Sequence, residues 1–322
     1  MENTYSSDGR FTTVEEQIKK LENYGISINN KEFAGNVLKS TSYYYLIDVY
    51  SEIFKIDGKR RDFLPFTTFE EFYSAYMFDI GLKFLITSFL KPIELHIKTL
   101  IAYYFSKTFS HRSSEYLSSG KYYNPSIVDI LEAKLTQDDY LKEKDNAPMW
   151  VIVNRLTFGE TAQLFKALKH ELQNQICAEF RTFTTREFEC ILDALVALRN
   201  NCAHDEPLYC FVFKINCNYE KREIREIIIN DPCNFYSLLK IISYLVDDNE
   251  LNRLVWDLTR LIDSVVKTIS PKAYTNLISR MGLQSNWIDG LHAEKEILTD
   301  YYQNIKIDTH LGTVKAINIT NN

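Results

Sequence analysis

TTREFECILDALVALRNNCAH, residues 184–204, is the stretch that most clearly indicates the fold class. Thr184 and Glu187 have the spacing of a capping box, in which each side chain accepts a hydrogen bond from the other residue's backbone N–H. The apolar residues that follow recur at three- and four-residue intervals and form one stripe of a helix. They are Phe188, Ile191, Leu192, Leu195 and Leu198. The stretch is therefore predicted to be an amphipathic helix with an arginine and a histidine at its end.

The rest of the chain has the same helical character. Its 322 residues include only 10 Gly and 7 Pro, so few turns are marked and a mainly all-α fold is predicted. Pro92 is predicted to start or kink a second long helix, because its ring removes a backbone hydrogen bond. Further helices are predicted over 14–24, 31–39, from 42, 68–91, 93–109, 128–135, 161–168, 235–245 and 251–268, with a turn at 157–159 and short strands or extended linkers at 209–215 and 225–229.

Composition excludes several classes of protein. No stretch approaches the roughly 20 apolar residues of a membrane span, and the start, MENTYSSDGRF, lacks the basic-then-apolar order of a signal peptide, so a cytoplasmic location is expected. The six cysteines contain no C-x-x-C pair, and no histidine pair has zinc spacing, so neither a metal nor another cofactor is predicted. The net charge of −6 argues against a surface that binds nucleic acid everywhere.

Any contact with RNA must therefore be local. Two groups of basic residues are candidates, Lys55, Lys59, Arg60 and Arg61 in one, and Lys221, Arg222 and Arg225 in the other. Lys98, which follows Glu94 by four residues on one helix face, is a further candidate. Charge runs of this kind are also common on solvated faces that bind nothing.

Arg199 and His204 enclose four residues at the end of the predicted helix. A five-residue step turns about 500° around an ideal helix, which leaves the two side chains about 140° apart. The helix must end or distort between them if both act on one group. Asn200, Asn201 and the later Pro207 favour an ending there.

The residue types at this position suit RNA cleavage without a metal. RNA supplies its own nucleophile, the 2′-hydroxyl, so a protein needs to move protons and stabilise charge on the phosphate. Histidine exchanges a proton near neutral pH, and the arginine fork fits two phosphate oxygens. Asn200 or Asn201 can orient the imidazole or hold a phosphate oxygen. One histidine per chain is few for a reaction with a base and an acid, so a homodimer that joins two such segments is predicted.

The spacing alone has a plainer explanation, because an arginine and a histidine at a helix end are often only capping or salt-bridging groups. The identity of the residues between them gives further support to a catalytic role. Arg-Asn-Asn-Cys-Ala-His, residues 199–204, resembles the R-N-x-x-A-H signature of HEPN-type ribonucleases, in the form found in Abi-like abortive-infection proteins of the AbiD and AbiF group. Segments 12–50, 76–106, 147–165 and 281–287 resemble successive parts of that family, in the same order.

The resemblance implies an all-α, HEPN-like helical bundle with additional N-terminal helices and a surface insertion. The implied regions are an N-terminal helical region at 1–66, a core at 67–290 with the insertion at about 110–148, and a polar tail at 291–322. It also implies phage defence by growth arrest, RNA as partner and, in the AbiF group, a companion small non-coding RNA.

Carried over residue by residue, the resemblance makes Arg199, Asn200 and His204 catalytic, with Asn201 in support, and makes Glu94 a candidate partner of the arginine. Two departures limit what is carried over. Lys83 stands where the family often has arginine. Some HEPN toxins are silenced by nucleotide transfer to a tyrosine two residues past the histidine, but that position holds Glu206 here, so this control is not predicted.

Two functions stay open. One is a metal-independent endoribonuclease toxin that leaves cyclic-phosphate and 5′-hydroxyl ends, and the other is a non-catalytic protein that holds a structured RNA and signals through a partner. A third interpretation makes Tyr43, Tyr44 and Tyr45 a platform on which bases stack, although adjacent tyrosines are more often core and interface aromatics.

Overall fold

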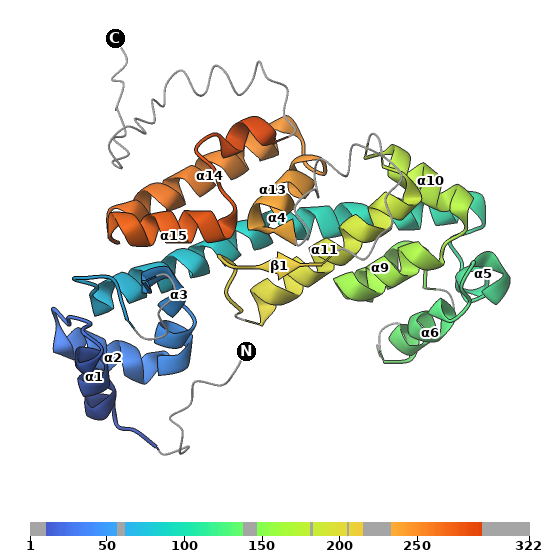
Figure 1. Cartoon of the computed structure of the whole chain (residues 1–322). Coiled ribbons are helices and arrows are strands. Elements are labelled where there is room, and N and C mark those ends of the chain that lie inside the picture. The colour runs from blue at the N-terminus through green and yellow to red at the C-terminus, as the bar shows by residue number, and fades with distance from the viewer. Residues whose placement is uncertain are drawn as a thin grey trace, which may run out of the picture. The chain divides into compact units, whose positions relative to one another are not determined.

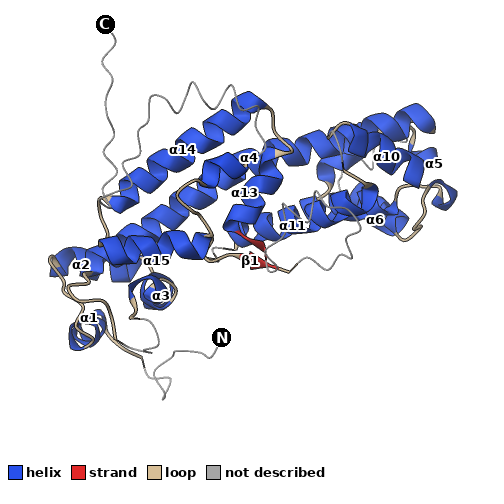
Figure 2. Ribbon diagram, turned by 45° about the horizontal axis from the view of Figure 1, so that its top comes forward, coloured by secondary structure: helices blue, strands red, loops and turns tan. Residues whose placement is uncertain are grey.

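The computed structural model of the chain describes residues 11–56, 62–137, 147–180, 183–204, 206–214 and 233–291. Helices make up nearly all regular structure in these ranges (Figure 1), which confirms the mainly all-α prediction. Within them the only sheet is a short antiparallel pair, β1 (Val212–Phe213) and β2 (Cys233–Asn234), drawn in red in Figure 2. β1 lies inside the segment 209–215 that was predicted as strand or linker, whereas 225–229 lies outside the described residues.

The chain forms two compact units. Unit 1 comprises Met1–Leu85, Pro207–Phe211 and Leu251–Asn322, and unit 2 comprises Ile86–Glu206 and Val212–Glu250. The longest helix, α4 (Phe69–Thr108), contributes residues to both units. Its first turn has the Thr68–Glu71 pairing of a capping box, in which the Glu71 N–H donates to Thr68 Oγ1 at 3.2 Å.

Pro92 lies inside α4, so of the two predicted alternatives the one in which it starts a second, separate helix is wrong. A proline in a helix interior costs about 3 kcal/mol, because its ring lacks the N–H and crowds the preceding turn. On both sides of it Phe89, Leu90 and Ile93 are buried. Burying each such side chain stabilises the fold by about 1.5–3 kcal/mol, which together exceeds the cost of the proline.

Unit 1 contains α1 (Val14–Asn23), α2 (Lys31–Ser40), the π-helical turn η1 (Tyr44–Asp48), α3 (Ser51–Phe54), nearly all of α14 (Asp248–Val266), α15 (Pro271–Met281) and η4 (Trp287–Gly290). The first two helices begin and end within a residue of their predicted bounds. The capping box of Thr13 and Glu16 is formed, and Gly25 follows α1 with a φ of 79°.

α15 was not predicted from the sequence. It begins with Pro271 in the first turn and ends at Gly282, whose φ of 76° is the left-handed conformation that glycine adopts without strain. It packs against α3, and the Asn276 side chain donates to the Ile53 carbonyl at 2.9 Å. The Ser270 N–H, at its start, donates to the Glu71 carboxylate at 2.6 Å.

Unit 2 contains α5 (Ser113–Tyr116), η2 (Ser119–Lys121), α6 (Ile127–Gln137), α8 (Met149–Ile152), η3 (Val153–Arg155), α9 (Phe158–Ala167), α10 (His170–Ala178), α11 (Thr185–Ala203) and α13 (Phe235–Ser243). α10 was not predicted. α11 packs against α9, α10 and α13. At their centre Phe188 stacks on Phe180 at 5.0 Å and meets Phe165 edge-on at 5.1 Å.

α9 begins three residues earlier than predicted. The stretch 157–159 was predicted as a turn, but Thr157 caps the helix and forms a capping box with Glu160. The Thr-x-x-Glu spacing was present in the sequence. Gly159, which favoured the turn, is tolerated in the first helical turn.

Thr184→Ala is expected to lower the free energy of unfolding by about 1 kcal/mol, because it removes the acceptor for the Glu187 N–H at the start of α11. Thr185→Ala, one residue later and without a role in the cap, is the matched control. Urea denaturation followed by circular dichroism measures both. Equal stability of the two variants would contradict a capping role for Thr184.

Candidate functional site

The Arg199–His204 motif lies at the end of α11, which continues as a helix through Ala203. His204 is the C-cap, and its backbone N–H donates to the Asn200 carbonyl at 2.9 Å. The helix therefore ends between the arginine and the histidine, as predicted, but only at Ala203, because Asn200 and Asn201 both keep helical conformation. Within one chain the helix directs the Arg199 and His204 side chains about 140° apart.

The arginine and the histidine of the motif are both accessible to solvent. His204 is exposed, and Arg199 and Asn200 are half-buried. In the part of the chain that the structure describes, no residue forms an ion pair or a hydrogen bond with the Arg199 guanidinium or the His204 imidazole. An unpaired guanidinium fork can bind an anion such as phosphate.

The two asparagines differ in their surroundings. Asn201 is buried, and its amide donates a long hydrogen bond of 3.5 Å to the Glu206 carboxylate. Its Oδ1 is buried without a hydrogen-bond partner among the described residues. Asn200, in contrast, is partly open to solvent.

Four residues after the motif, the chain is held by a buried carboxylate. Asp79, on α4, has no exposed surface. Its Oδ1 accepts hydrogen bonds from the backbone N–H groups of Leu208 (2.9 Å) and Tyr209 (2.8 Å). Its Oδ2 accepts one from the Tyr50 hydroxyl (3.1 Å) and lies 3.3 Å from Lys83 Nζ. Burial raises the pKa of Asp79, while Lys83 and the Tyr209 N–H act in the opposite direction.

Two tyrosines complete this cluster in unit 1. The rings of Tyr50 and Tyr209 stack at 5.5 Å, and the Tyr209 hydroxyl donates to the Val49 carbonyl at 3.0 Å. Burial raises the pKa of both hydroxyls. Sequence reasoning missed the cluster. Its signal was an aspartate in an otherwise apolar stretch with a lysine four residues on, since a buried carboxylate needs partners.

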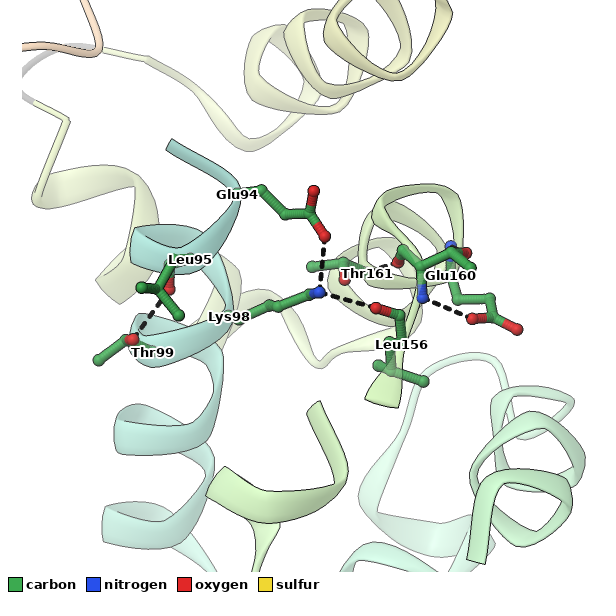
Figure 3. A network of polar contacts seen from close by, with 8 residues as sticks. Glu94, Leu95, Lys98, Thr99, Leu156, Glu160 and Thr161 are labelled. Carbon is green, nitrogen blue, oxygen red and sulfur yellow. Dashed lines mark hydrogen bonds and ion pairs between the residues drawn. The ribbon is translucent and has the colours of Figure 1, made fainter. Parts of the chain in front are cut away.

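Glu94 and Lys98 form a second internal network, in unit 2 (Figure 3). Lys98 is only 7% exposed, and its Nζ lies 2.6 Å from the Glu94 carboxylate and 2.7 Å from the Leu156 carbonyl. The lysine thereby joins α4 to the residue before the Thr157 cap of α9. Glu94 pairs with Lys98 here, and no contact with Arg199 is present among the described residues. Lys98 is not accessible to an RNA phosphate in this structure.

Most of the other predicted RNA contacts lie outside the described residues. These are Lys59, Arg60, Arg61, Lys221, Arg222 and Arg225. Lys55 is described, and it pairs with Glu52 at 2.5 Å. Of the three tyrosines, Tyr43 is half-buried beneath Lys20, whose Nζ lies 5.1 Å from the ring, whereas Tyr44 and Tyr45 are exposed and meet edge-on.

Across the described ranges there is no group of three or more His, Cys, Asp or Glu side chains that could hold a metal ion. None of the helices described combines the length and the apolar character that a membrane span requires.

Comparison with known proteins connects this geometry to a family. A model of the Abi-like protein family matches residues 36–210, which is more than half of the chain. The chain belongs to the Abi-like protein family. Membership relates this Abi-like protein to abortive infection, a form of phage defence. Searches of curated proteins and of solved structures found no match.

The matched range ends at Cys210 and so contains both the Arg199–His204 motif and the segment that Asp79 anchors. It also contains the Glu94–Lys98 network. The two internal ion pairs of α4 and the accessible motif thus belong to the family region of this Abi-like protein.

Asp79→Ala is expected to lower the free energy of unfolding by about 3–5 kcal/mol, because it leaves Lys83 and two backbone N–H groups buried without a partner. Adding Lys83→Met should restore part of the loss, since the unpaired ammonium is then absent. Urea denaturation of both single variants and the double variant measures the coupling. Strictly additive losses would contradict an energetic pairing of these two residues.

Proposed function

We propose that this Abi-like protein defends against phage as a metal-independent endoribonuclease of the HEPN type and is a member of the AbiD and AbiF group. Arg199 and His204 are its catalytic residues, and Asn200 assists them. The observation that supports this best is the accessible arginine and histidine at the end of α11, neither engaged by a described residue and both inside the family match. The resemblance of residues 199–204 to the R-N-x-x-A-H signature supplies the reaction class.

The proposed reaction is an internal transfer within the RNA. A histidine removes the proton from a 2′-hydroxyl, and the oxygen attacks the adjacent phosphorus. The bond to the 5′-oxygen breaks, and a second group returns a proton to that oxygen. Arg199 stabilises the extra negative charge on the phosphate. The products are a 2′,3′-cyclic phosphate and a 5′-hydroxyl.

A homodimer brings together an arginine and a histidine that one helix directs apart. Because α11 stays helical through Ala203, ideal helix geometry directs Arg199 and His204 of one chain about 140° apart, which does not favour action of both on one phosphate. Two α11 ends related by a two-fold axis bring the arginine of one chain toward the histidine of the other, which gives each dimer two equivalent Arg199–His204 pairs. The proposed RNA partners are the target and a small non-coding RNA that restrains or scaffolds the protein.

His204→Ala is expected to abolish new RNA ends. Purified wild-type protein and the variant are incubated with total RNA in the presence of a metal chelator, and cyclic-phosphate and 5′-hydroxyl ends are counted by sequencing. The matched control is His170→Ala, an exposed histidine outside the motif, which should cleave as the wild type does. Wild-type protein that binds RNA but produces no ends would favour the alternative, a non-catalytic RNA-binding protein that signals through a partner.

Mixing two inactive variants tests whether the site is shared between two chains. Arg199→Ala and His204→Ala proteins are each expected to be inactive. After they are unfolded and refolded together, about a quarter of the wild-type activity should return, because half of the dimers are mixed and each has one intact pair. Refolding each variant alone is the control. No recovery, with mixed dimers demonstrated by two affinity tags, would exclude a site shared between chains.

A further inference from the structure

Unit 2 contains a pocket of about 450 Å³ between α4 and the short helices α8 and η3. Its α4 side is formed by residues at three- and four-residue intervals, which share one face of the helix. Those that matter below are Thr99, Tyr103, Ser106 and Lys107. Trp150 is on the opposite wall, and most of the lining surface is apolar. The volume is within the usual range for a small-molecule site.

Two large aromatic side chains are exposed at this pocket. Tyr103 is 57% exposed and Trp150 is 50% exposed. The Trp150 ring is held on one side by His111, which stacks on it at 5.3 Å with an interplanar angle of 29°. Exposed aromatic rings that line a concave site are typical of ligand binding and need an occupant to bury them.

The Ser106 and Thr99 hydroxyl groups of the pocket differ in their hydrogen bonding. The Ser106 Oγ is buried, and none of the described residues forms a hydrogen bond with it. Thr99, two turns earlier, instead donates to the Leu95 carbonyl at 2.8 Å (Figure 3), which is how a helical hydroxyl usually satisfies itself. Leaving a buried hydroxyl unpaired is costly, so a ligand atom that bonds to it gains affinity.

The pocket also carries a positive charge. The Lys107 Nζ lies 5.8 Å from the centre of the Tyr103 ring and 6.0 Å from that of Tyr104, and no described carboxylate pairs with it. Asn154 donates its amide N–H to the Trp150 carbonyl at 2.8 Å, which leaves its amide oxygen as an acceptor. The pocket thus combines flat rings, a hydroxyl, an acceptor and a cation.

We infer that this pocket binds one nucleotide, with its base stacked on Tyr103 or Trp150, its base edge bonded to Ser106 and its phosphate beside Lys107. A purely apolar occupant leaves the hydroxyl unpaired and makes no use of the charge. A base has a flat face for the rings and donors and acceptors at its edge. The nucleotide is either free or part of an RNA strand. The inference rests on the proposed function in that RNA is the partner, but it does not require cleavage.

The test uses the full-length His204→Ala protein, so that bound RNA stays intact. Binding of a fluorescein-labelled 12-nucleotide single-stranded RNA is followed by anisotropy, with AMP and UMP as competitors. Adding Trp150→Ala or Tyr103→Ala is expected to weaken binding about tenfold, the size of one base-stacking contact. Lys107→Ala should reduce the dependence of affinity on salt.

Matched controls remove similar rings elsewhere. Trp256→Ala changes a tryptophan that is 40% exposed in unit 1, and Tyr123→Ala changes a tyrosine that is 75% exposed in unit 2. Neither should alter RNA affinity. Thermal unfolding of every variant confirms that it is folded, and Tyr103→Phe, which keeps the ring, should bind as tightly as the parent.

Competition by AMP or UMP would identify a free nucleotide as an occupant, and binding of the oligonucleotide alone would identify a base within a strand; both support the inference. Unchanged affinity in Trp150→Ala and Tyr103→Ala would overturn it. Occupation by a hydrophobic dye that neither nucleotides nor RNA displace would overturn it too. If wild-type protein binds RNA through this pocket but creates no new ends, only the proposed catalysis fails. If it cleaves RNA and Trp150→Ala leaves KM unchanged, only the pocket assignment fails.

Discussion

The carboxylate of Asp79 is the constraint on which unit 1 depends. It has no exposed surface, and a buried charge is tolerated only when it is paired and hydrogen-bonded. Four groups meet this requirement, and two of them are backbone N–H groups of Leu208 and Tyr209. Because backbone donors cannot be moved without moving the chain, the carboxylate determines where the segment just after the Arg199–His204 motif lies within unit 1.

Local signals in the sequence predicted local structure well. Each Thr-x-x-Glu spacing became a helix start, as at Thr13, Thr68 and Thr184, because a cap depends only on residues within one turn. The alternative in which Pro92 starts a new helix was wrong for the converse reason. Whether a proline ends a helix depends on what the flanking residues bury, and that is decided by distant parts of the chain. α10 has only nine residues, but α15 has eleven and was missed although Pro271 and Gly282 mark its start and end.

In the candidate site, too, local features were predicted from the sequence and distant contacts were not. Sequence identified Arg199, Asn200 and His204, and the structure added that only Asn201 of the two asparagines is buried. The sequence could not reveal that Lys98 is buried and bonds to the Leu156 carbonyl, because that carbonyl is 58 residues away. It also could not reveal Asp79, whose backbone partners are 129 and 130 residues away. Contacts of this length leave no regular spacing in the sequence.

The two internal ion pairs of α4 bear on how an acidic chain can bind RNA. Lys83 and Lys98 are buried, and each pairs with a carboxylate four residues earlier, so neither releases counterions on binding. A count of lysines along this helix therefore overstates its attraction for phosphate. Under the proposed function, the affinity contributed by the described residues must come from a few unpaired cations, Arg199 and Lys107 among them, together with stacking on aromatic rings. Stacking depends little on salt, so this division suits a protein whose net charge of −6 opposes non-specific binding.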